Sequence, residues 1–279
     1  LIWCQLFSEP NAGVDLAAVR SKAVREGDNW VISGQKVWTS GAQVADYGIL
    51  LVRTDPDLPK HRGLTYFLID MTLPGISVQP IKQISGHSEF NEVFLDSVVI
   101  ADSCRLGEVS QGWQVAMHAL TAERFKRLNT RMPSMMSVLQ LSQECELHGE
   151  KAIEKDSVRQ SLANCLVNKC AQEHFMSRML TVLAQGKDLG SEASILKLMS
   201  CQLNQKLSAY AMELFEENGA VVDAETHPLM QELFDAYLWA PGLRIAGGAD
   251  EILMNIIGER TLGLPSEPRL DKGKAFKDL

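Results

Sequence analysis

The stretch Gln5-Leu6-Phe7-Ser8-Glu9-Pro10-Asn11-Ala12-Gly13-Val14-Asp15 ends an apolar run and begins a turn. Pro10 excludes a regular strand ladder, and Asn11 and Gly13 tolerate a positive φ. A loop of this kind leaves backbone N–H groups facing outward, where they can meet an anion or the polar edge of a heterocycle. An ordinary connection between two strands is the alternative, and this stretch taken alone favours that alternative.

The composition indicates a globular chain with an acidic surface. It has 279 residues, of which 46% are hydrophobic, and a net charge of -8. A chain of this size can bury a substantial core in one large or two medium domains. The acidic balance argues against a nucleic-acid or anionic-membrane surface. Charges interrupt the apolar windows before about 18 residues, so we expect no membrane span.

The cysteines favour a reducing compartment, and we expect a cytoplasmic protein. The six positions are 4, 104, 145, 165, 170 and 201, without a CxxC pair and without a cluster of zinc-ligand spacing. We therefore expect reduced, mostly buried thiols and no metal site. Because the chain begins at Leu1, inside a stretch with the pattern of a strand, we expect further residues to precede it.

The first part of the chain, residues 1–108, has the pattern of β-structure. Short runs rich in Val, Ile, Leu, Phe and Tyr occupy residues 23–25, 29–33, 37–40, 48–53, 64–70, 77–84 and 91–100. The pairs Gly27-Asp28, Ser33-Gly34 and Pro74-Gly75 punctuate these runs as turns do. The pattern predicts an antiparallel β-barrel or sandwich.

The second part, residues 109–279, has the periodicity of helices. Apolar residues such as Met117, Leu120 and Leu128 recur at spacings of three, four or their sums. Further helical stretches are expected at residues 158–183, 191–218, 229–237 and 251–262. The fold class predicted is α+β, with a β-domain at 1–108 followed by an all-α four-helix bundle domain at 109–279.

Four motifs carry a resemblance to a known family. They are Ser8-Glu9-Pro10-Asn11-Ala12-Gly13-Val14-Asp15, Gly34-Gln35-Lys36-Val37-Trp38-Thr39-Ser40-Gly41, Gly112-Trp113-Gln114-Val115-Ala116-Met117 and Gly247-Gly248-Ala249-Asp250-Glu251-Ile252. In their order and spacing they resemble the acyl-CoA dehydrogenase flavoproteins over essentially the whole chain. The resemblance implies a middle β-domain and a C-terminal four-helix bundle, with the family's N-terminal helical domain missing.

The resemblance also implies which residues hold the isoalloxazine ring of FAD. They are Gln5, Phe7, Ser8, Gly13, Val14, Trp38, Thr39 and Ser40. The backbone around Phe7 and Ser8 would meet the pyrimidine edge, and Trp38 would lie beside the ring. Thr39 or Ser40 would hydrogen-bond near the flavin N5, since a flavin needs an apolar wall and a few fixed donors. Without the resemblance, Trp38 would be interpreted as a core residue.

The reaction implied is α,β-desaturation of an acyl-CoA thioester, which needs a desolvated carboxylate as base and donors at the thioester oxygen. Many family members carry the base in the C-terminal loop, where this chain has Ala246-Gly247-Gly248. A subset carries it on the first long helix, and Glu123 matches that position. A solvated helix carboxylate is the alternative. Gly247 or Gly248 would offer the thioester oxygen a backbone N–H, or would only begin the next helix.

Arg124, next to Glu123, matches a family arginine at the substrate mouth. With Arg127 and Arg131 it would equally form one charged helix face. The substrate-binding residues implied by the resemblance are therefore Arg124 and Val14.

Three departures from the family pattern concern the cofactor. Val14 replaces a serine that contacts substrate and flavin, and residues 147–152 lack an Arg-x-x-Phe-Gly motif that reaches a neighbour's FAD pyrophosphate. Glu216 and Glu217 replace a Gly-Gly pair, and two carboxylates would repel a pyrophosphate. We therefore hypothesise that this chain supplies half of a flavin site and that a different homologous subunit supplies the other half, in a hetero-tetramer; a homo-tetramer is the alternative.

Two further segments, residues 59–67 and 89–96, look most like bacterial heteromeric acyl-CoA dehydrogenases, including those acting on steroid side chains. The function predicted is FAD-dependent acyl-CoA dehydrogenation in fatty acid or steroid side-chain degradation, with electrons passed to an electron-transferring flavoprotein. An acyl-CoA oxidase and a non-catalytic partner subunit are the alternatives.

Overall fold

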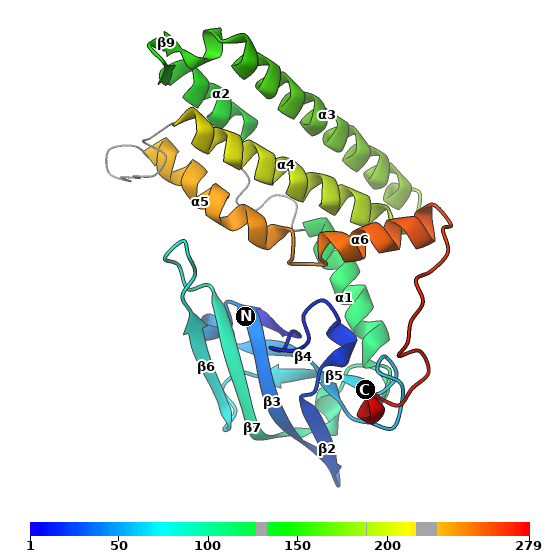
Figure 1. Ribbon diagram of the computed structural model, residues 1–279. Coiled ribbons are helices and arrows are strands. Elements are labelled where there is room, and N and C mark those ends of the chain that lie inside the picture. Colours follow the sequence, from blue (N-terminus) through cyan, green and yellow to red (C-terminus); the bar gives the residue numbers. More distant parts are fainter. Residues whose placement is uncertain (127–132, 188, 216–227) are drawn as a thin grey trace. The chain divides into compact units, whose positions relative to one another are not determined.

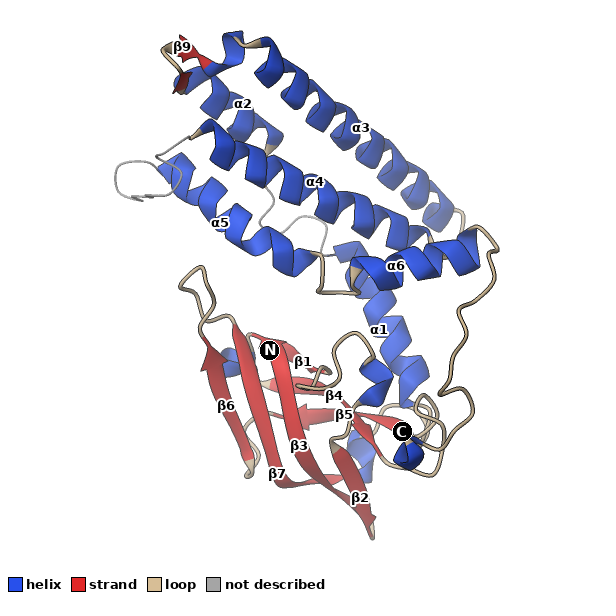
Figure 2. Ribbon diagram, viewed as in Figure 1, coloured by secondary structure: helices blue, strands red, loops and turns tan. Residues whose placement is uncertain are grey.

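The computed structural model describes residues 1–126, 133–187, 189–215 and 228–279, and the side chains of residues 122–126 lie outside its description. The chain forms two compact units, which are Leu1–Leu120 with Glu267–Leu279, and Thr121–Ser266. The first is built on a β-sheet and the second is helical (Figure 2). The α+β class predicted from the sequence is confirmed, whereas the boundary between residues 108 and 109 stays a prediction.

The β-unit contains one seven-stranded sheet in which the strand order is β1-β4-β2-β3-β7-β6, with β5 paired to β4 (Figure 1). The strands are β1 (Trp3–Leu6), β2 (Lys22–Glu26), β3 (Asn29–Ser40), β4 (Tyr47–Arg53), β5 (Leu64–Asp70), β6 (Ile76–Ile81) and β7 (Phe90–Ala101). Most pairs are antiparallel, as the sequence predicts, but β1 and β2 pair with β4 in parallel. The chain leaves β1 and crosses to the β2–β3 hairpin before returning as β4, so β1 and β4 run in the same direction.

Strand β3 joins two runs that the sequence presents as separate. The Ser33-Gly34 pair is an irregularity within β3, where its register with β7 shifts between Ile32 and Gly34. A Cβ on Gly34 would lie 2.2 Å from the Oγ of Ser21, so only glycine fits this close approach. A second register shift lies between Lys36 and Thr39.

Two apolar clusters stabilise the β-unit. One fills the curl of the sheet around Phe67, Leu6 and Ile32. The other joins Phe7, Tyr66 and Ala116, and so packs the segment after β1 against the beginning of helix α1 (Gly112–Lys126). The second cluster thereby sets the position of the first turns of α1 against the loop that the sequence assigns to the flavin.

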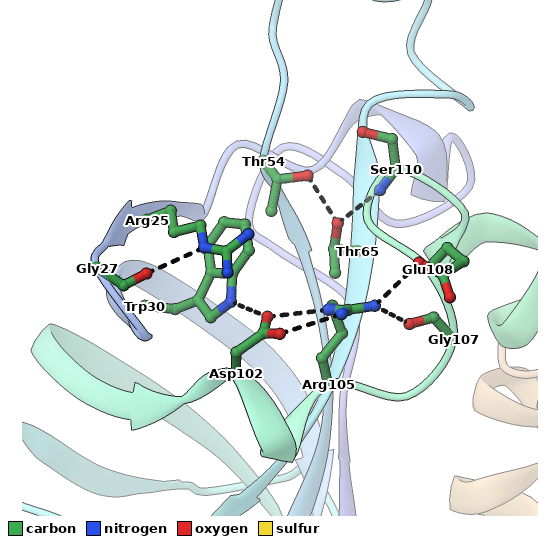
Figure 3. Close-up of polar contacts among 10 residues, drawn as sticks. All are labelled: Arg25, Gly27, Trp30, Thr54, Thr65, Asp102, Arg105, Gly107, Glu108 and Ser110. Atoms are coloured by element: carbon green, nitrogen blue, oxygen red, sulfur yellow. Dashed lines mark hydrogen bonds and ion pairs between the residues drawn. The ribbon is translucent and has the colours of Figure 1, made fainter.

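A polar network fixes the segment that leads into α1 (Figure 3). Asp102 accepts hydrogen bonds from Trp30 Nε1 at 2.7 Å and from Arg105 Nε at 3.0 Å. Its hydrogen bonds to Arg105 and Trp30 hold the pKa of Asp102 far below its ordinary value. A Cβ on Gly112 would lie 2.5 Å from the carbonyl carbon of Thr65. Because any side chain at position 112 would collide with the backbone of strand β5, helix α1 begins at a glycine.

The helical unit contains the helices that follow α1. They are α2 (Met135–Glu144), α3 (Asp156–Ala184), α4 (Glu192–Leu214), α5 (Pro228–Leu243) and α6 (Asp250–Ile256), with a short hairpin of β8 (Glu146–Leu147) and β9 (Glu150–Lys151). Helix α4 packs between α3 and α5 (Figure 1). The helix predicted at 191–218 is observed as far as Leu214, and residues 216–217, which carry the expected repulsion, lie outside the described residues.

Short 3-10 turns occur at Leu16–Ala18, Ala42–Val44, Asp102–Cys104, Ala152–Glu154 and Phe276–Asp278, and α6 continues as a π-helical turn over Ile257–Thr261. All six cysteines are free thiols. In the parts of the chain that the structure describes, no helix is both long and apolar enough to cross a bilayer. No group of three or more His, Cys, Asp or Glu in those same parts is arranged to hold a metal ion.

Candidate functional site: two loops held by buried lysines

The loop after β1 contains a tight turn. Glu9 and Ala12 exchange backbone hydrogen bonds of 3.1 Å and 3.0 Å, as a turn with Pro10 at its corner allows. The carbonyl of Ser8 accepts a hydrogen bond of 2.9 Å from the N–H of Val37 on β3. The structure thus brings together the two segments, 5–14 and 38–40, to which the sequence assigns the flavin.

A lysine buried beneath this loop joins it to the sheet. Lys36 has no exposed surface, and its Nζ donates to the carbonyl of Phe7 at 3.0 Å, to Glu9 Oε1 at 2.8 Å and to the carbonyl of Leu51 at 2.7 Å. Its three N–H groups therefore all have acceptors, which is the condition under which a buried ammonium is tolerated. Burial lowers the pKa of Lys36, against the attraction of Glu9.

The carboxylate of Glu9 is satisfied from its other side. Its oxygens accept the backbone N–H groups of Arg20 at 2.6 Å and Ser21 at 2.9 Å. Burial raises the pKa of Glu9, but Lys36 and the hydrogen bonds outweigh burial and hold the pKa below its ordinary value. Glu9 thus ties both ends of the loop formed by residues 9–21 to one point of β3.

Trp38 lies just beyond this anchor in a strained conformation. Its φ is 59°, within the left-handed region, and its side chain is 57% exposed. A bulky residue rarely adopts such a φ, which costs on the order of 1–3 kcal/mol and persists only where the surroundings impose it. The register shift between Lys36 and Thr39 imposes it here. The indole meets the ring of Phe90 edge-on, with centroids 5.9 Å apart.

The hydroxyl groups after Trp38 point to different environments. Thr39 is fully buried, and its Oγ1 has no hydrogen-bond partner among the described residues. Ser40 is exposed, as Trp38 is. An exposed aromatic wall beside an exposed hydroxyl matches what a flavin ring requires, so Trp38 and Ser40 fit FAD.

The other residues predicted around the flavin have different exposures. Gln5 is half-buried on β1 opposite Ile49, and Phe7 is buried edge-on against Tyr66. Gly13 and Val14 lie beyond the turn and are exposed, with the Val14 side chain at 60%.

The loop before α6 in the helical unit is also held by a buried lysine. Gly247 and Gly248 have φ values of 68° and 106°, which explains the two glycines. Lys197 of α4 donates from Nζ to the carbonyl of Gly248 at 2.7 Å and lies 4.0 Å from Asp250 Oδ1. Arg244 holds the other oxygen of the buried Asp250 at 2.7 Å. The carbonyl of Gly248 is thereby fixed, and the loop has a defined shape.

Sequence reasoning missed both lysines. Lys36 shares the inward parity of Trp30 and Ile32 along β3, and Lys197 interrupts the apolar run around Leu196 on α4. A charge at a core position of a strand or helix is the signal that could have found them.

Glu123 lies on α1 by its backbone. Its side chain and that of Arg124 are outside the described residues. Their assignments as base and substrate contact therefore stay predictions.

The chain thus joins a β-sheet unit, which carries a loop compatible with a flavin, to a unit of packed helices. Comparison with known proteins specifies the family. Residues 4–98 match the family model "Acyl-CoA dehydrogenase, middle domain", and residues 110–262 match "Acyl-CoA dehydrogenase, C-terminal domain". The chain belongs to the acyl-CoA dehydrogenase family, an oxidoreductase family whose members are FAD flavoproteins.

Among curated relatives, the acyl-CoA dehydrogenase FadE34 of Mycobacterium tuberculosis is 41% identical over 270 residues, covering 95% of this chain and 35% of that protein. The acyl-CoA dehydrogenase IpdE1 of the same organism is 35% identical over 269 residues, covering 96% of this chain and 68% of that protein. This chain thus spans about a third of the first relative and about two thirds of the second.

Solved structures show the same fold. The Tcur3481-Tcur3483 steroid ACAD has a TM-score of 0.83 and 25% identity, covering 96% of this chain and 69% of that one. The ChsE4-ChsE5 complex from Mycobacterium tuberculosis has a TM-score of 0.80 and 27% identity, covering 96% and 70%.

Proposed function

We propose that this chain acts in the FAD-dependent α,β-dehydrogenation of an acyl-CoA thioester, with Glu123 removing the α-proton. FAD, when bound, supplies the acceptor for the hydride. Among this chain's own residues, Trp38 would pack against the isoalloxazine ring, and Ser40 would offer its exposed hydroxyl near N5. The backbone at Phe7 and Ser8 would meet the polar pyrimidine edge of the ring. Gly247 or Gly248 would donate a backbone N–H to the thioester oxygen.

The observation that carries this proposal is Trp38. Its exposed indole sits in a left-handed backbone conformation. An apolar side chain held at such a cost in contact with water indicates a surface that a planar ligand covers. The matched family consists of FAD flavoproteins, which supports the isoalloxazine ring as that ligand.

A substitution of the base tests the reaction. Glu123→Gln keeps the size of the side chain and removes the proton acceptor, so turnover should fall by roughly 10²–10⁴-fold while flavin content stays the same. Glu213→Gln is the matched control, because Glu213 is an exposed carboxylate on α4. An unaltered rate for Glu123→Gln would reject Glu123 as the base, and would favour the alternative of a non-catalytic partner subunit.

We also propose that the assembly is heteromeric. The segment where the family's Arg-x-x-Phe-Gly motif would lie forms the β8–β9 hairpin, in which Glu146 and Glu150 are exposed. Carboxylates there would repel a neighbour's pyrophosphate. Two of the similar structures, ChsE4-ChsE5 and Tcur3481-Tcur3483, are assemblies of two different proteins.

The flavin content per chain tests the assembly. The chain should bind FAD weakly alone, and should contain about half a flavin per chain when co-purified with the product of a neighbouring gene, as a half-site requires. Stoichiometric, tightly bound FAD in a homo-oligomer would contradict a heteromeric site.

The substrate and the electron acceptor are proposals of the same kind. We expect a bulky or branched acyl group, such as a steroid side chain, because the Tcur3481-Tcur3483 steroid ACAD has the same fold. Comparing kcat/KM for steroid-side-chain and straight-chain acyl-CoA thioesters tests the substrate. Electrons should pass to an electron-transferring flavoprotein, whereas rapid hydrogen peroxide formation in air would indicate the oxidase alternative.

A further inference from the structure

The last residues of the chain return to the β-unit and pack on the connection between β4 and β5. Phe276 N–H donates to the carbonyl of Leu58 and Lys277 N–H to that of Pro56, both at 3.0 Å. Ala275 forms an isolated bridge with Pro59. Residues 267–279, which we name the C-terminal clamp, are thus fixed to this connection by backbone pairing as well as by side chains.

One side chain beneath the clamp reaches the loop that the proposed function assigns to FAD. Lys60 donates from Nζ to Asp15 Oδ2 at 2.7 Å and forms a second ion pair with Asp271 of the clamp. The Lys60 side chain is only 16% exposed. Desolvation lowers the pKa of Lys60, but the hydrogen bonds to Asp15 and Asp271 outweigh it, so that the pKa is raised. One ammonium therefore links the clamp to the end of the loop at residue 15.

Arg53 provides a second link between the clamp and the loop, because the ring of Phe276 covers its guanidinium. Arg53 is buried and donates from Nη2 to the carbonyl of Ala17 at 2.6 Å and from Nε to that of Val19 at 3.2 Å. The ring of Phe276 covers its guanidinium, with 3.6 Å between the guanidinium carbon and the ring centroid. A ring in this position excludes water from the group that holds residues 17–19, and adds a cation–π attraction.

We propose that the C-terminal clamp positions residues 15–19, the outer part of the loop 9–21 whose first residues face the flavin, with Asp271 and Phe276 as positioning residues that act through Lys60 and Arg53. The inner part of the loop has its own anchor, the pair of Glu9 and Lys36. The clamp supplies the second attachment, and a loop that must present backbone groups to a planar ring needs both. Its role towards FAD rests on the proposed function, whereas its role in ordering residues 15–19 does not.

Amide hydrogen exchange of the whole chain, without flavin, tests the ordering. The N–H groups of Ala18 and Val19 donate within the turn, to Asp15 and Leu16, so their protection reports the order of the outer part. In Asp271→Asn and in Phe276→Leu they should exchange roughly two- to fivefold faster. The N–H groups of Arg20 and Ser21, held by Glu9, should keep their rates.

Conservative and control variants make this test specific. Asp271→Glu and Phe276→Tyr should restore the protection of Ala18, because each retains the charge or the ring. Asp278→Asn removes the same charge from an exposed position of the clamp and should leave the exchange rates of Ala18 and Val19 unchanged. Unchanged exchange at Ala18 and Val19 in both loss variants would overturn the proposal, as would equal acceleration at Arg20 and Ser21.

FAD binding, followed by the quenching of flavin fluorescence, tests the consequence. Asp271→Asn and Phe276→Leu should lower the affinity for FAD roughly two- to fivefold, the same factor by which they speed amide exchange. The conservative variants should recover the affinity. Faster exchange with unchanged FAD affinity would overturn the positioning role. Absence of FAD binding by the unaltered chain, alone and in its assembly, would instead refute the proposed function. Amide exchange at residues 15–19 would then still decide whether the clamp orders these residues.

Discussion

Lys36 in the β-unit and Lys197 in the helical unit both bury an ammonium to hold a loop, yet they do so to different extents. Lys36 is enclosed by three acceptors at 2.7–3.0 Å, one of which is the carboxylate of Glu9. Lys197 donates to the carbonyl of Gly248 and lies 4.0 Å from one oxygen of Asp250, whose other oxygen is held by Arg244. The inner part of the flavin-facing loop therefore depends on one buried ion pair, while the loop before α6 shares its anchor between two cations.

The difference teaches that the same residue types can build an anchor on a single cation or an anchor that two cations share. Removing one partner of a fully enclosed pair leaves an uncompensated buried charge. Removing one cation from a shared anchor leaves the carboxylate paired. The comparison predicts that replacing each lysine with methionine lowers the free energy of unfolding by different amounts.

The largest loss is expected for Lys36→Met. The substitution leaves Glu9 buried without its cation, and the free energy of unfolding should fall by about 3–5 kcal/mol. Urea denaturation of the chain measures this. Lys22→Met on β2 is the control. Because Lys22 is exposed, this substitution should change the free energy of unfolding by no more than about 0.5 kcal/mol. A loss below about 1 kcal/mol for Lys36→Met would mean that the pair does not anchor the loop.

A smaller loss is expected for Lys197→Met. Asp250 keeps Arg244, so the main change is one charged hydrogen bond to the carbonyl of Gly248, worth about 1.5–3 kcal/mol. The same urea titration compares it with Lys206→Met, an exposed position on α4. If Lys197→Met costs as much as Lys36→Met, the two anchors are equivalent and the comparison is wrong.

The sequence predicts most of what surrounds these anchors. Turn residues such as Pro10 and Gly13, and the change of period after Gly107, are local signals, and they yield the α+β class and the turn after Phe7, to which only the family resemblance assigns the flavin. The parallel pairing of β1 with β4 and the return of Phe276 to the β-unit depend on contacts between distant residues. No local pattern encodes such contacts, so the sequence could not give them.

The same distinction applies within the candidate site. Thr39 and Ser40 are equivalent in the motif, and only the register of β3 shows which hydroxyl is exposed. The strain at Trp38 likewise arises from the shift of β3 against β7. Both are properties of pairing across the sheet, which the motif does not specify.

The pH dependence of stability sharpens the comparison in the β-unit. The pKa of Glu9 in the folded chain lies below its ordinary value of 4.5, so its contribution is complete above pH 4.5 and is lost as the pH falls through the folded pKa. The difference in unfolding free energy between the unaltered chain and Glu9→Gln should therefore shrink on acidification, by at most about 1.4 kcal/mol per pH unit. Urea titrations at several pH values below 6 measure it. A difference that stays constant would contradict the ion pair.

The smallest effect on stability is expected at Trp38, where strain and contact oppose each other. Trp38→Gly removes the edge-on contact with Phe90, worth about 0.5–1.5 kcal/mol, but relieves a left-handed φ that costs on the order of 1–3 kcal/mol. The unfolding free energy should thus change by no more than about 1 kcal/mol. FAD affinity should fall roughly tenfold, because an aromatic contact of about 1.4 kcal/mol is lost.

Trp3→Gly is the matched control for this substitution. Trp3 is also a half-exposed indole, stacked on Tyr47 with centroids 5.0 Å apart, but it lies in the regular strand β1. Its replacement gains nothing from relief of strain, so the same change should cost about 1–2 kcal/mol. Equal losses at the two tryptophans would show that the backbone at Trp38 is not strained. A smaller loss at Trp38 together with weaker FAD binding would show that the fold tolerates this conformation for the sake of the surface that it exposes.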